Sequence, residues 1–309
     1  MTRQGVLLGL LAGVCFGTSS IWSAALLGAG WSPAAVTLVR LGGAALILLV
    51  PALAVSRRRV RFTRTDLLYG VGIGGCYVSY VNALEHMAVG LALLLEYSSV
   101  LLVTLWTWWQ GHRPGAHTAL GGALCLGGLA LALDVTGDLR VDLTGLLWAL
   151  GSAAGCAVFF VISSHDGSAP PLVTAWSGTA IAAAFVLVLS LLGLMPLRTT
   201  AADVTMLGTR LPWFLPVLGM TVVSSAIAMI TGIGAARLLG ARLASFVGLS
   251  EVLFGVALAW LVLGQSFTGW QCIGCLGVIT GIVLVRLDEG GAPLASVGYS
   301  PKEPAISPS

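Results

Sequence analysis

The chain has 309 residues, of which 57% are hydrophobic and only 9% are charged, and its formal net charge is +3. With a mean hydropathy of +0.98, it lacks the charged residues that a soluble protein of this length needs to cover its surface. Its arginines stand in short clusters between apolar runs, which is typical of membrane orientation and excludes a nucleic-acid-binding face. The composition therefore predicts an all-α membrane protein whose surroundings are the lipid bilayer.

Apolar runs long enough to cross a membrane, which takes about 20 helical residues, follow one another along the chain. The first run, after Arg3, is longer than the core of a cleaved signal peptide, so we interpret it as a retained helix. Ten transmembrane helices are predicted, at residues 5–27, 34–55, 67–87, 90–110, 117–133, 143–163, 171–193, 213–236, 240–263 and 267–286.

The positive residues between these runs indicate the orientation of the chain. If both termini are cytoplasmic, the inner side holds ten arginines: Arg3, Arg57, Arg58, Arg59, Arg61, Arg64, Arg113, Arg237, Arg242 and Arg286. The outer side then holds only Arg140, Arg198 and Arg210. The positive-inside rule favours this arrangement in the inner (plasma) membrane of a bacterial cell, with the loops at 134–142 and near Asp203 outside. Residues 288–309, rich in Pro, Gly and Ser, are predicted to form a disordered cytoplasmic tail.

The sequence also repeats itself. "SPAAVT" opens the second run and "APPLVT" opens the seventh, and "GGALCLGGLALAL" (121–133) parallels "GCLGVITGIVLV" (274–285). Gly121 and Gly128 align with Gly274 and Gly281 at one shared offset of 153 positions. Each half, 1–138 and 139–287, then holds five helices, so the second enters the membrane from the opposite side. Two inverted five-helix repeats are typical of secondary transporters, whose substrate sites lie at mid-membrane between the halves.

Several stretches carry a family resemblance: the openers "GVLLGLLAGVCFG" and "GLLWALGSAAGCAVFFV", the segment "LLLEYSSVLLVTLW", and above all "ASFVGLSEVLFGVALAWLVLGQSFTGWQCIGCLGVITGIVLV". Together they resemble the EamA-type carriers of the drug/metabolite transporter superfamily over residues 5–286. The "EY" at Glu96 and Tyr97 is most similar to the branch that contains threonine and homoserine exporters. The chain departs from the family pattern at Val100 and Val252, where members often carry proline, and at Gln265, where they often carry glutamate. Without those prolines, helix breaks at these points are in doubt.

Three ionisable residues lie inside predicted spans: Arg40, Glu96 and Glu251. Arg40 and Glu96 are each about six residues into helices that run in the same direction, roughly 9 Å below the outer helix ends. Their equal depth allows an ion pair that holds two helices together. It also allows a polar site for a zwitterionic substrate or a proton, and the two roles can coexist.

Glu251 is about 11 residues into its run, close to mid-membrane, and Gly248 and Gly255 share its helical face. No cationic partner is evident at its depth, and a buried carboxylate in that position tends to bind a proton, which suits a proton-coupled carrier. The alternative is a protonated carboxyl that hydrogen-bonds a neighbouring helix.

Aromatic and amide side chains are further candidates for the wall of a substrate cavity: Tyr77, Tyr80, Asn82, Tyr97 and Trp176. Each alone is more often a packing or interfacial residue, but Tyr77, Tyr80 and Asn82 fall within about one helical turn and favour a polar wall. Glu85 and His86 stand at the outer end of their helix, where water reaches them.

Other classes of membrane protein fit less well. The sequence has no GxxxxGK[ST] motif for ATP, no HExxH zinc motif and no cofactor-binding motif, and its four histidines lie at or beyond span ends. Cys272 and Cys275 form a CxxC inside a span, where they are interpreted as packing residues and not metal ligands. The prediction is a secondary transporter, not an enzyme, that exports small metabolites such as amino acids by alternating access. Export is either coupled to the proton gradient or is facilitated flow of the substrate down its own gradient. The alternatives are a membrane scaffold or sensor without transport and, as the weaker of the two, an intramembrane enzyme.

Overall fold

The computed structural model describes residues 2–56, 63–87, 89–133, 143–165, 169–206, 209–263 and 268–290. The first part of the chain forms α1 (Thr2–Gly17), α2 (Ser19–Gly28), α3 (Pro33–Val55), α4 (Arg64–Ala83), α5 (Val89–Tyr97), α6 (Ser99–Trp109) and α7 (Ala116–Ala132). The second part forms α8 (Leu143–Ser163), α9 (Pro171–Leu191), β1 (Val204–Met206), β2 (Thr209–Leu211), α10 (Phe214–Leu218), the π-helix η1 (Gly219–Ile227), α11 (Ala228–Gly248), α12 (Ser250–Leu263) and α13 (Gly269–Gly290). The helical prediction is confirmed, and the short β1–β2 hairpin is an unpredicted addition. The loop at 134–142 lies outside the described residues.

Seven helical segments in the described part of the chain are long and apolar enough to cross a membrane, and α7 is a shorter apolar helix. One of the seven, Phe214–Leu258, has 45 residues, which at 1.5 Å per residue is about 68 Å, more than twice the thickness of the hydrocarbon layer. Gly240 interrupts this segment at φ 78° and ψ 164°, a backbone conformation that glycine adopts without strain. Gly240 therefore divides this segment into two helical stretches, the first containing α10, η1 and the start of α11, and the second the end of α11 and part of α12. The total of ten crossings stays a prediction.

Three apolar runs are broken by a single residue: α1 and α2 meet at Thr18, α5 and α6 at Ser98, and α11 and α12 at Leu249. Two of these breaks, at Ser98 and Leu249, form without prolines and lie two and three residues before Val100 and Val252, the points at which the sequence left helix breaks in doubt. The hydroxyls of Thr18 and Ser98 donate to backbone carbonyls three residues earlier, over 2.7 and 2.5 Å. Such bonds offer the backbone an alternative to the regular helix and bend it.

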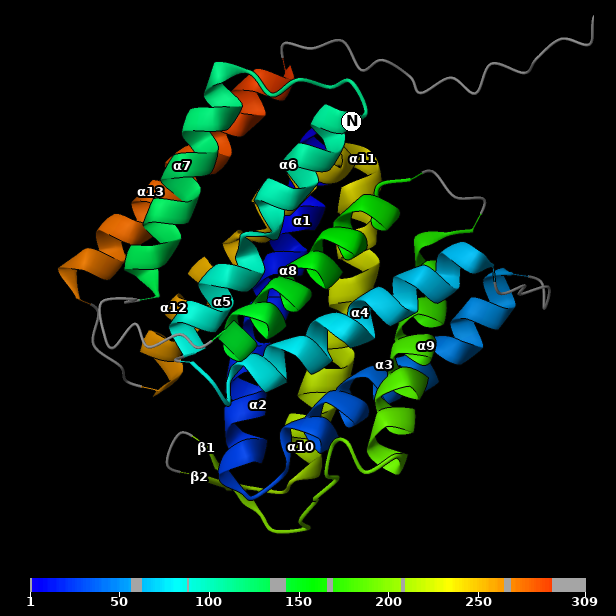
Figure 1. The fold of residues 1–309 in the computed structure, drawn as a ribbon. Helices are drawn as coiled ribbons and strands as arrows, with labels where there is room; N and C mark the ends of the chain where they lie inside the picture. The colour runs from blue at the N-terminus through cyan, green and yellow to red at the C-terminus, as the bar shows by residue number, and fades with distance from the viewer. Residues whose placement is uncertain are drawn as a thin grey trace, which may run out of the picture.

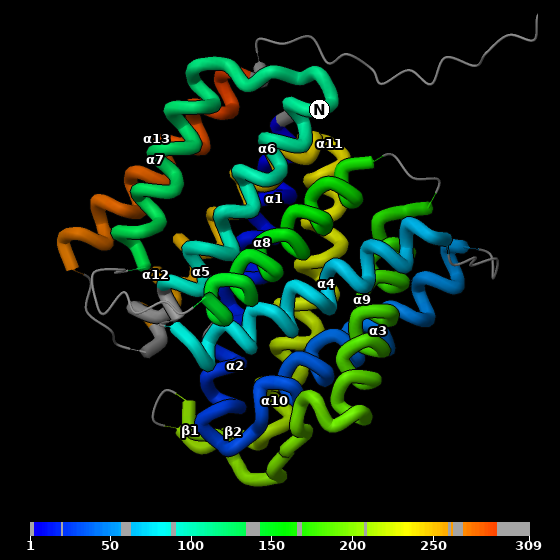
Figure 2. The backbone as a smooth tube through the Cα atoms, viewed as in Figure 1, coloured from blue at the N-terminus to red at the C-terminus, as the bar shows by residue number. Residues whose placement is uncertain are grey.

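The helices pack in pairs drawn from the two parts of the chain. In Figure 1, α7 and α13 lie side by side along one flank of the bundle, and α3, α4 and α9 form the opposite flank. Between them α1 packs against α11, and α8 packs against α4. Figure 2 shows the β1–β2 hairpin beside α2, at the end of the bundle away from the N-terminus.

The α7–α13 pair depends on glycines. A Cβ atom added to Gly128 would lie 2.6 Å from the carbonyl oxygen of Gly274, and one added to Gly121 would lie 2.7 Å from that of Gly281. The reciprocal contacts are equally close, at 2.5 Å each. In lipid the hydrophobic effect does not drive helices together, so close approach of the backbones at small residues stabilises such a pair.

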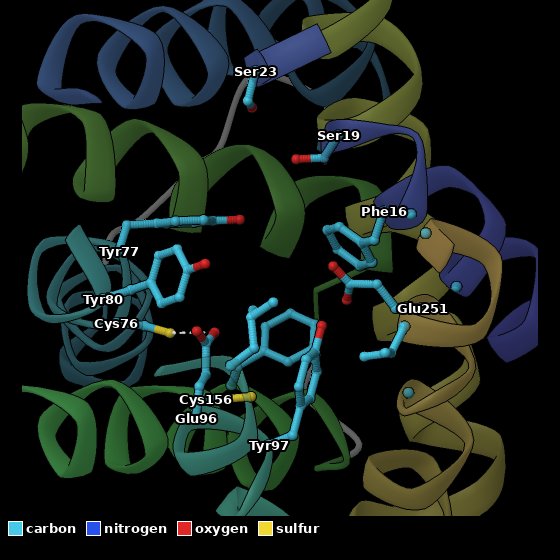
Figure 3. A pocket seen from close by; sticks show the side chains of 18 of the residues that line it. Phe16, Ser19, Ser23, Cys76, Tyr77, Tyr80, Glu96, Tyr97, Cys156 and Glu251 are labelled. Carbon is cyan, nitrogen blue, oxygen red and sulfur yellow. Dashed lines mark hydrogen bonds between the residues drawn. The ribbon is translucent and has the colours of Figure 1, made fainter. Parts of the chain in front are cut away.

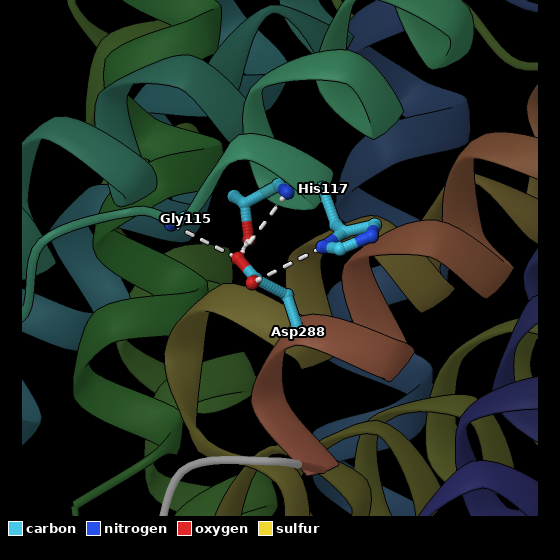
Figure 4. Close-up of polar contacts among 4 residues, drawn as sticks. Gly115, His117 and Asp288 are labelled. Atoms are coloured by element: carbon cyan, nitrogen blue, oxygen red, sulfur yellow. Dashed lines mark hydrogen bonds and ion pairs between the residues drawn. The ribbon is translucent and has the colours of Figure 1, made fainter.

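Asp288 joins the same two helices at their other end. Its Oδ2 atom accepts hydrogen bonds from the backbone N–H groups of Gly115 and Thr118, at 2.9 and 3.2 Å, and from the Thr118 hydroxyl at 2.5 Å. His117 Nδ1 lies 3.8 Å from Oδ1 (Figure 4). Gly115 has no side chain to cap α7, so α13 supplies the capping carboxylate. The first three residues of the predicted tail are therefore helical, and residues 291–309 lie outside the described residues.

We expect Gly128→Ala to destabilise the protein by about 1–3 kcal/mol, the usual cost of overpacking, because its methyl group meets backbone that cannot move aside. The matched control is Gly127→Ala, since a Cβ atom at Gly127 meets nothing within 4 Å. Thermal unfolding in detergent compares them. Equal melting temperatures for the two variants would show that the α7–α13 contact does not limit stability.

Candidate functional site

A cavity of about 780 Å³ lies between the two parts of the chain. Helices α1 to α5 line it from the first part, and α8, α11, α12 and α13 line it from the second. Its walls are mostly apolar, with glycines from α1 and aromatic rings such as Phe16, Phe159 and Phe160. Because helices from both parts of the chain line it, any relative movement of the two parts changes its shape.

The cavity extends to one end of the bundle only. Its rim includes Leu27, near the end of α2, and Pro33, the first residue of α3. In the other direction the lining stops at residues such as Gly9 and Ala244, well before the far helix ends. Beyond them the helices are packed around buried side chains that form one apolar cluster, among them Leu239 and Phe246.

A buried arginine closes this far end further. Arg242 donates from Nη2 to the Thr107 hydroxyl over 2.7 Å and to the carbonyl oxygen of His112 over 2.5 Å. These bonds connect the region after the Gly240 break to α6 and to the loop that follows it. Among the described residues, the lining of the cavity therefore reaches one end of the bundle and stops short of the other.

Six of the eight side chains that the sequence singled out line this cavity: Arg40, Tyr77, Tyr80, Glu96, Tyr97 and Glu251. The other two do not. Asn82 donates to the carbonyl oxygen of Val78 on its own helix over 2.8 Å, and Trp176 packs against the apolar core between α3, α4 and α9. Neither prediction is met, because both residues stand on helix faces that turn away from the cavity.

Arg40 lines the cavity from α3, but it does not pair with Glu96. Its guanidinium donates to the Ser225 hydroxyl from Nε over 3.2 Å, to the Ser19 hydroxyl from Nη1 over 2.9 Å and to the Ser224 carbonyl oxygen from Nη2 over 3.3 Å. It also stands 4.8 Å from the centre of the Tyr77 ring, in cation–π range. Among the residues that the structure describes, Arg40 forms no ion pair, so of the two roles that the sequence left open the ion pair with Glu96 does not form.

Glu96 stands near the end of α5, two residues before the break at Ser98. The Cys76 thiol of α4 donates to its Oε1 atom over 3.4 Å, and the Ser152 hydroxyl lies 3.5 Å from the same sulfur (Figure 3). These partners are neutral and weak, so the carboxylate keeps acceptor capacity for a ligand.

Glu251 lies in the first turn of α12, directly after the break at Leu249. This placement differs from the predicted one, deep within an unbroken helix, and it puts the carboxylate at a helix N-terminus, where the backbone dipoles favour a negative charge. Gly17 of α1 brings the helices together here, because a Cβ atom on it would lie 3.0 Å from the Glu251 carbonyl oxygen. The Tyr97 hydroxyl points toward the Glu251 carboxylate (Figure 3).

Sequence reasoning missed the small polar residues of this site. Ser19, Cys76 and Cys156 line the cavity, and Ser224 and Ser225 hold Arg40 from η1. Only the pair "SS" at 224–225 inside a strongly apolar run gave a signal, since hydroxyls within a membrane helix seek partners across helices.

Comparison with known proteins agrees with this arrangement. The model of the EamA-like transporter family matches residues 3–133 and 143–287. The chain belongs to the EamA-like transporter family. It is therefore a transporter of the drug/metabolite transporter superfamily and a multi-pass membrane protein.

Individual relatives of this EamA-family protein are distant. The threonine/homoserine exporter RhtA of Salmonella typhimurium (strain SL1344) is 26% identical over 258 residues, which cover 79% of this chain and 78% of that protein. RhtA of Escherichia coli (strain K12) is 28% identical over 200 residues, 60% of this chain and 64% of that protein. The uncharacterized inner membrane transporter YicL of Salmonella typhimurium (strain LT2) is 23% identical over 303 residues, which cover 93% of this chain and 97% of that protein. A crystal structure 18% identical in sequence superposes with a TM-score of 0.77 and covers 93% of this chain and 98% of its own, which shows the shared fold.

The cavity of this transporter should be open to water from its rim. In a chain whose six cysteines are replaced by alanine, we expect Ser23→Cys, at the cavity wall, to react quickly with a charged methanethiosulfonate in detergent. The matched control is Ala44→Cys, at a fully buried core position, which should stay unmodified. Mass spectrometry of the intact protein measures both. Equal modification of the two positions would contradict a defined wet cavity.

Proposed function

We propose that this protein is a secondary transporter that exports amino acids or similarly small metabolites by alternating access of two inverted five-helix repeats, 1–138 and 139–287. The observation that carries the proposal is the cavity itself. It lies where the two parts of the chain meet, it is closed at one end, and it holds a carboxylate from each part, Glu96 and Glu251. A carrier that exposes one site alternately to two sides needs this kind of compartment.

The helix pairing supports the inverted repeat. Gly121 and Gly274 are repeat mates, as are Gly128 and Gly281, yet Gly121 contacts Gly281 and Gly128 contacts Gly274. A two-fold axis between α7 and α13 produces such exchanged contacts. If it relates Gly121 to Gly274 and Gly281 to Gly128, then the contact of Gly121 with Gly281 implies a second contact, of Gly274 with Gly128. Cys125 would stand near this axis, because its thiol donates over 3.6 Å to the carbonyl oxygen of Val278, its own mate at the same offset of 153.

Amino acids are the proposed cargo because two of the relatives are named threonine/homoserine exporters and because the cavity offers both negative and positive groups to a small polar solute. The proposed driving force is the proton gradient. Among the described residues, neither Glu96 nor Glu251 is ion-paired with a cation, and the thiol that donates to Glu96 is neutral. A carboxylate at membrane depth without an ion-paired cation is most easily held when it binds a proton. A cationic group of the substrate would then compete with that proton for the same oxygens.

The proposed location is the inner (plasma) membrane with both termini in the cytoplasm. In this orientation the rim of the cavity, at the end of α2 and the start of α3, faces outward, and the Arg242 contacts close the cytoplasmic end. With this orientation the described Arg3, Arg64, Arg113, Arg237, Arg242 and Arg286 would face the cytoplasm and only Arg198 and Arg210 the outside, which is the distribution that the positive-inside rule favours.

Transport in proteoliposomes tests the function. We expect purified protein to exchange labelled L-threonine across the bilayer, and Glu251→Gln to lower this exchange by about tenfold or more, since losing a charge-assisted hydrogen bond costs about 1.5–3 kcal/mol. The matched control is Glu85→Gln, which changes an exposed carboxylate outside the cavity and should transport normally. Undiminished exchange by the Glu251→Gln protein would remove this carboxylate from the mechanism, and the absence of exchange for each of the twenty standard amino acids would contradict the proposed cargo.

The orientation has its own test. In intact cells, the cysteine-free chain with Ser23→Cys should react with a membrane-impermeant maleimide added to the medium, because the rim faces outward. The same chain with Arg113→Cys, an exposed position after α6, should react only after the cells are permeabilised. The reverse pattern would invert the topology.

A further inference from the structure

We propose that Arg40 is the receptor for the carboxylate of a zwitterionic substrate whose ammonium group lies between Glu96 and Glu251, and that Ser19, Ser224 and Ser225 position the guanidinium for this task. This inference rests on the proposed function and specifies how the cargo lies in the cavity. It defines the substrate class as molecules that carry a free carboxylate and an ammonium group close together, such as α-amino acids.

The partners of Arg40 are all neutral. Three of its five N–H groups donate to two serine hydroxyls and one backbone carbonyl, and the remaining two have no partner among the residues that the structure describes. A guanidinium stays charged at any physiological pH, and a charge inside the membrane is costly until an opposite charge compensates it. The site around Arg40 thus provides a fixed cation with free donors and lacks only the anion.

Arg40 and the two carboxylates share the cavity without touching. Ser19 and Tyr77, which contact Arg40, lie toward one side of the cavity in Figure 3, whereas Glu96 and Tyr97 lie toward the other. Both carboxylates are near enough to interact electrostatically with Arg40, but neither is ion-paired with it in the described structure. A zwitterion in the space between them has its carboxylate compensated by Arg40 and its ammonium group compensated by the two glutamates. An amine without a carboxylate leaves the charge of Arg40 uncompensated.

The serine contacts hold the guanidinium in one place. Ser225 accepts from Arg40 Nε and donates its own proton to the carbonyl oxygen of Met220, five residues earlier, over 3.0 Å. This i−5 spacing comes from the π-helix η1, a rare element that often marks functional sites. Ser224 is held in turn by the Thr18 hydroxyl at 2.7 Å. An arginine fixed in this way loses little rotamer freedom when a ligand binds, which favours affinity.

The hydrogen bonds around Arg40 also join the two parts of the chain. Arg40 and Ser19 come from α3 and α2, whereas Ser224 and Ser225 come from η1. The geometry of a carboxylate site at Arg40 therefore depends on the relative position of the two parts. Rearrangement of these contacts as the parts move would change the affinity for the carboxylate between the two sides of the membrane.

Competition by an amidated substrate tests the assignment. In proteoliposomes that exchange L-threonine, we expect L-threonine amide, which keeps the ammonium group but has no carboxylate, to compete at least about tenfold less well than L-threonine, because it loses the charge-assisted bonds to Arg40. In Arg40→Met this difference should vanish. In Arg40→Lys, which keeps the charge and loses the planar fork, it should be partly retained.

Ser225→Ala reports on positioning. Ser164→Ala is its matched control, because the Ser164 hydroxyl, just after α8, donates to the carbonyl oxygen of Val161 and lies outside the cavity. Ser225→Ala should raise the KM for L-threonine severalfold with little change in kcat, while Ser164→Ala changes neither. This variant keeps the test valid even if Arg40→Met does not fold.

Each result decides between defined alternatives. Equal competition by threonine and its amide in the wild-type protein would overturn the carboxylate assignment while leaving the transport function intact. An unchanged preference for the acid over the amide in Arg40→Met would also overturn it. If the wild-type protein exchanges no amino acid, the proposed function fails first and this inference fails with it.

Discussion

The cost of a charge inside a membrane governs the organisation of this protein. Arg40, Glu96 and Glu251 lie within largely apolar helices, and all three line a single cavity where water or a ligand can compensate them. Around them the chain supplies small polar groups in place of counter-ions: serine hydroxyls, a thiol and a backbone carbonyl. Those groups hold the side chains in position without neutralising them, which leaves the charges free to act on a solute.

The same constraint explains why the helices break where they do. The interruptions at Ser98 and Leu249 each lie two residues from a cavity glutamate, and the interruption at Thr18 precedes Ser19, a partner of Arg40. A break exposes backbone polar groups, which the membrane tolerates only where they face protein or a wet compartment. Breaks and charges therefore gather in one region, while the unbroken α7 and α13 stand apart and associate through glycine backbone contacts.

Much of this could be predicted from the sequence because the hydrophobic effect and chain length determine it. The helical class and most helix bounds followed from apolar runs, and six of the eight proposed site residues line the cavity because buried ionisable and tyrosine side chains in such runs need a polar neighbour. The errors share one cause. Depth along a helix can be counted from the sequence, but the direction in which a side chain points around the helix depends on tertiary packing. Trp176 and Asn82 were expected to face the cavity, yet the structure places neither in its lining. Equal depth left a pair between Arg40 and Glu96 open, and both line the cavity without an ion pair between them.

The carboxylate that caps α7 has a consequence for biogenesis. Asp288 and Gly115 are 173 positions apart in the chain, so α7 enters the bilayer long before the ribosome has made the residue that completes its first turn. Until then the N-terminal N–H groups of α7 depend on water or lipid headgroups. The cap of α7 therefore forms only when α13 packs against it, late in translation. Until that step, α7 lies in the membrane without its capping carboxylate.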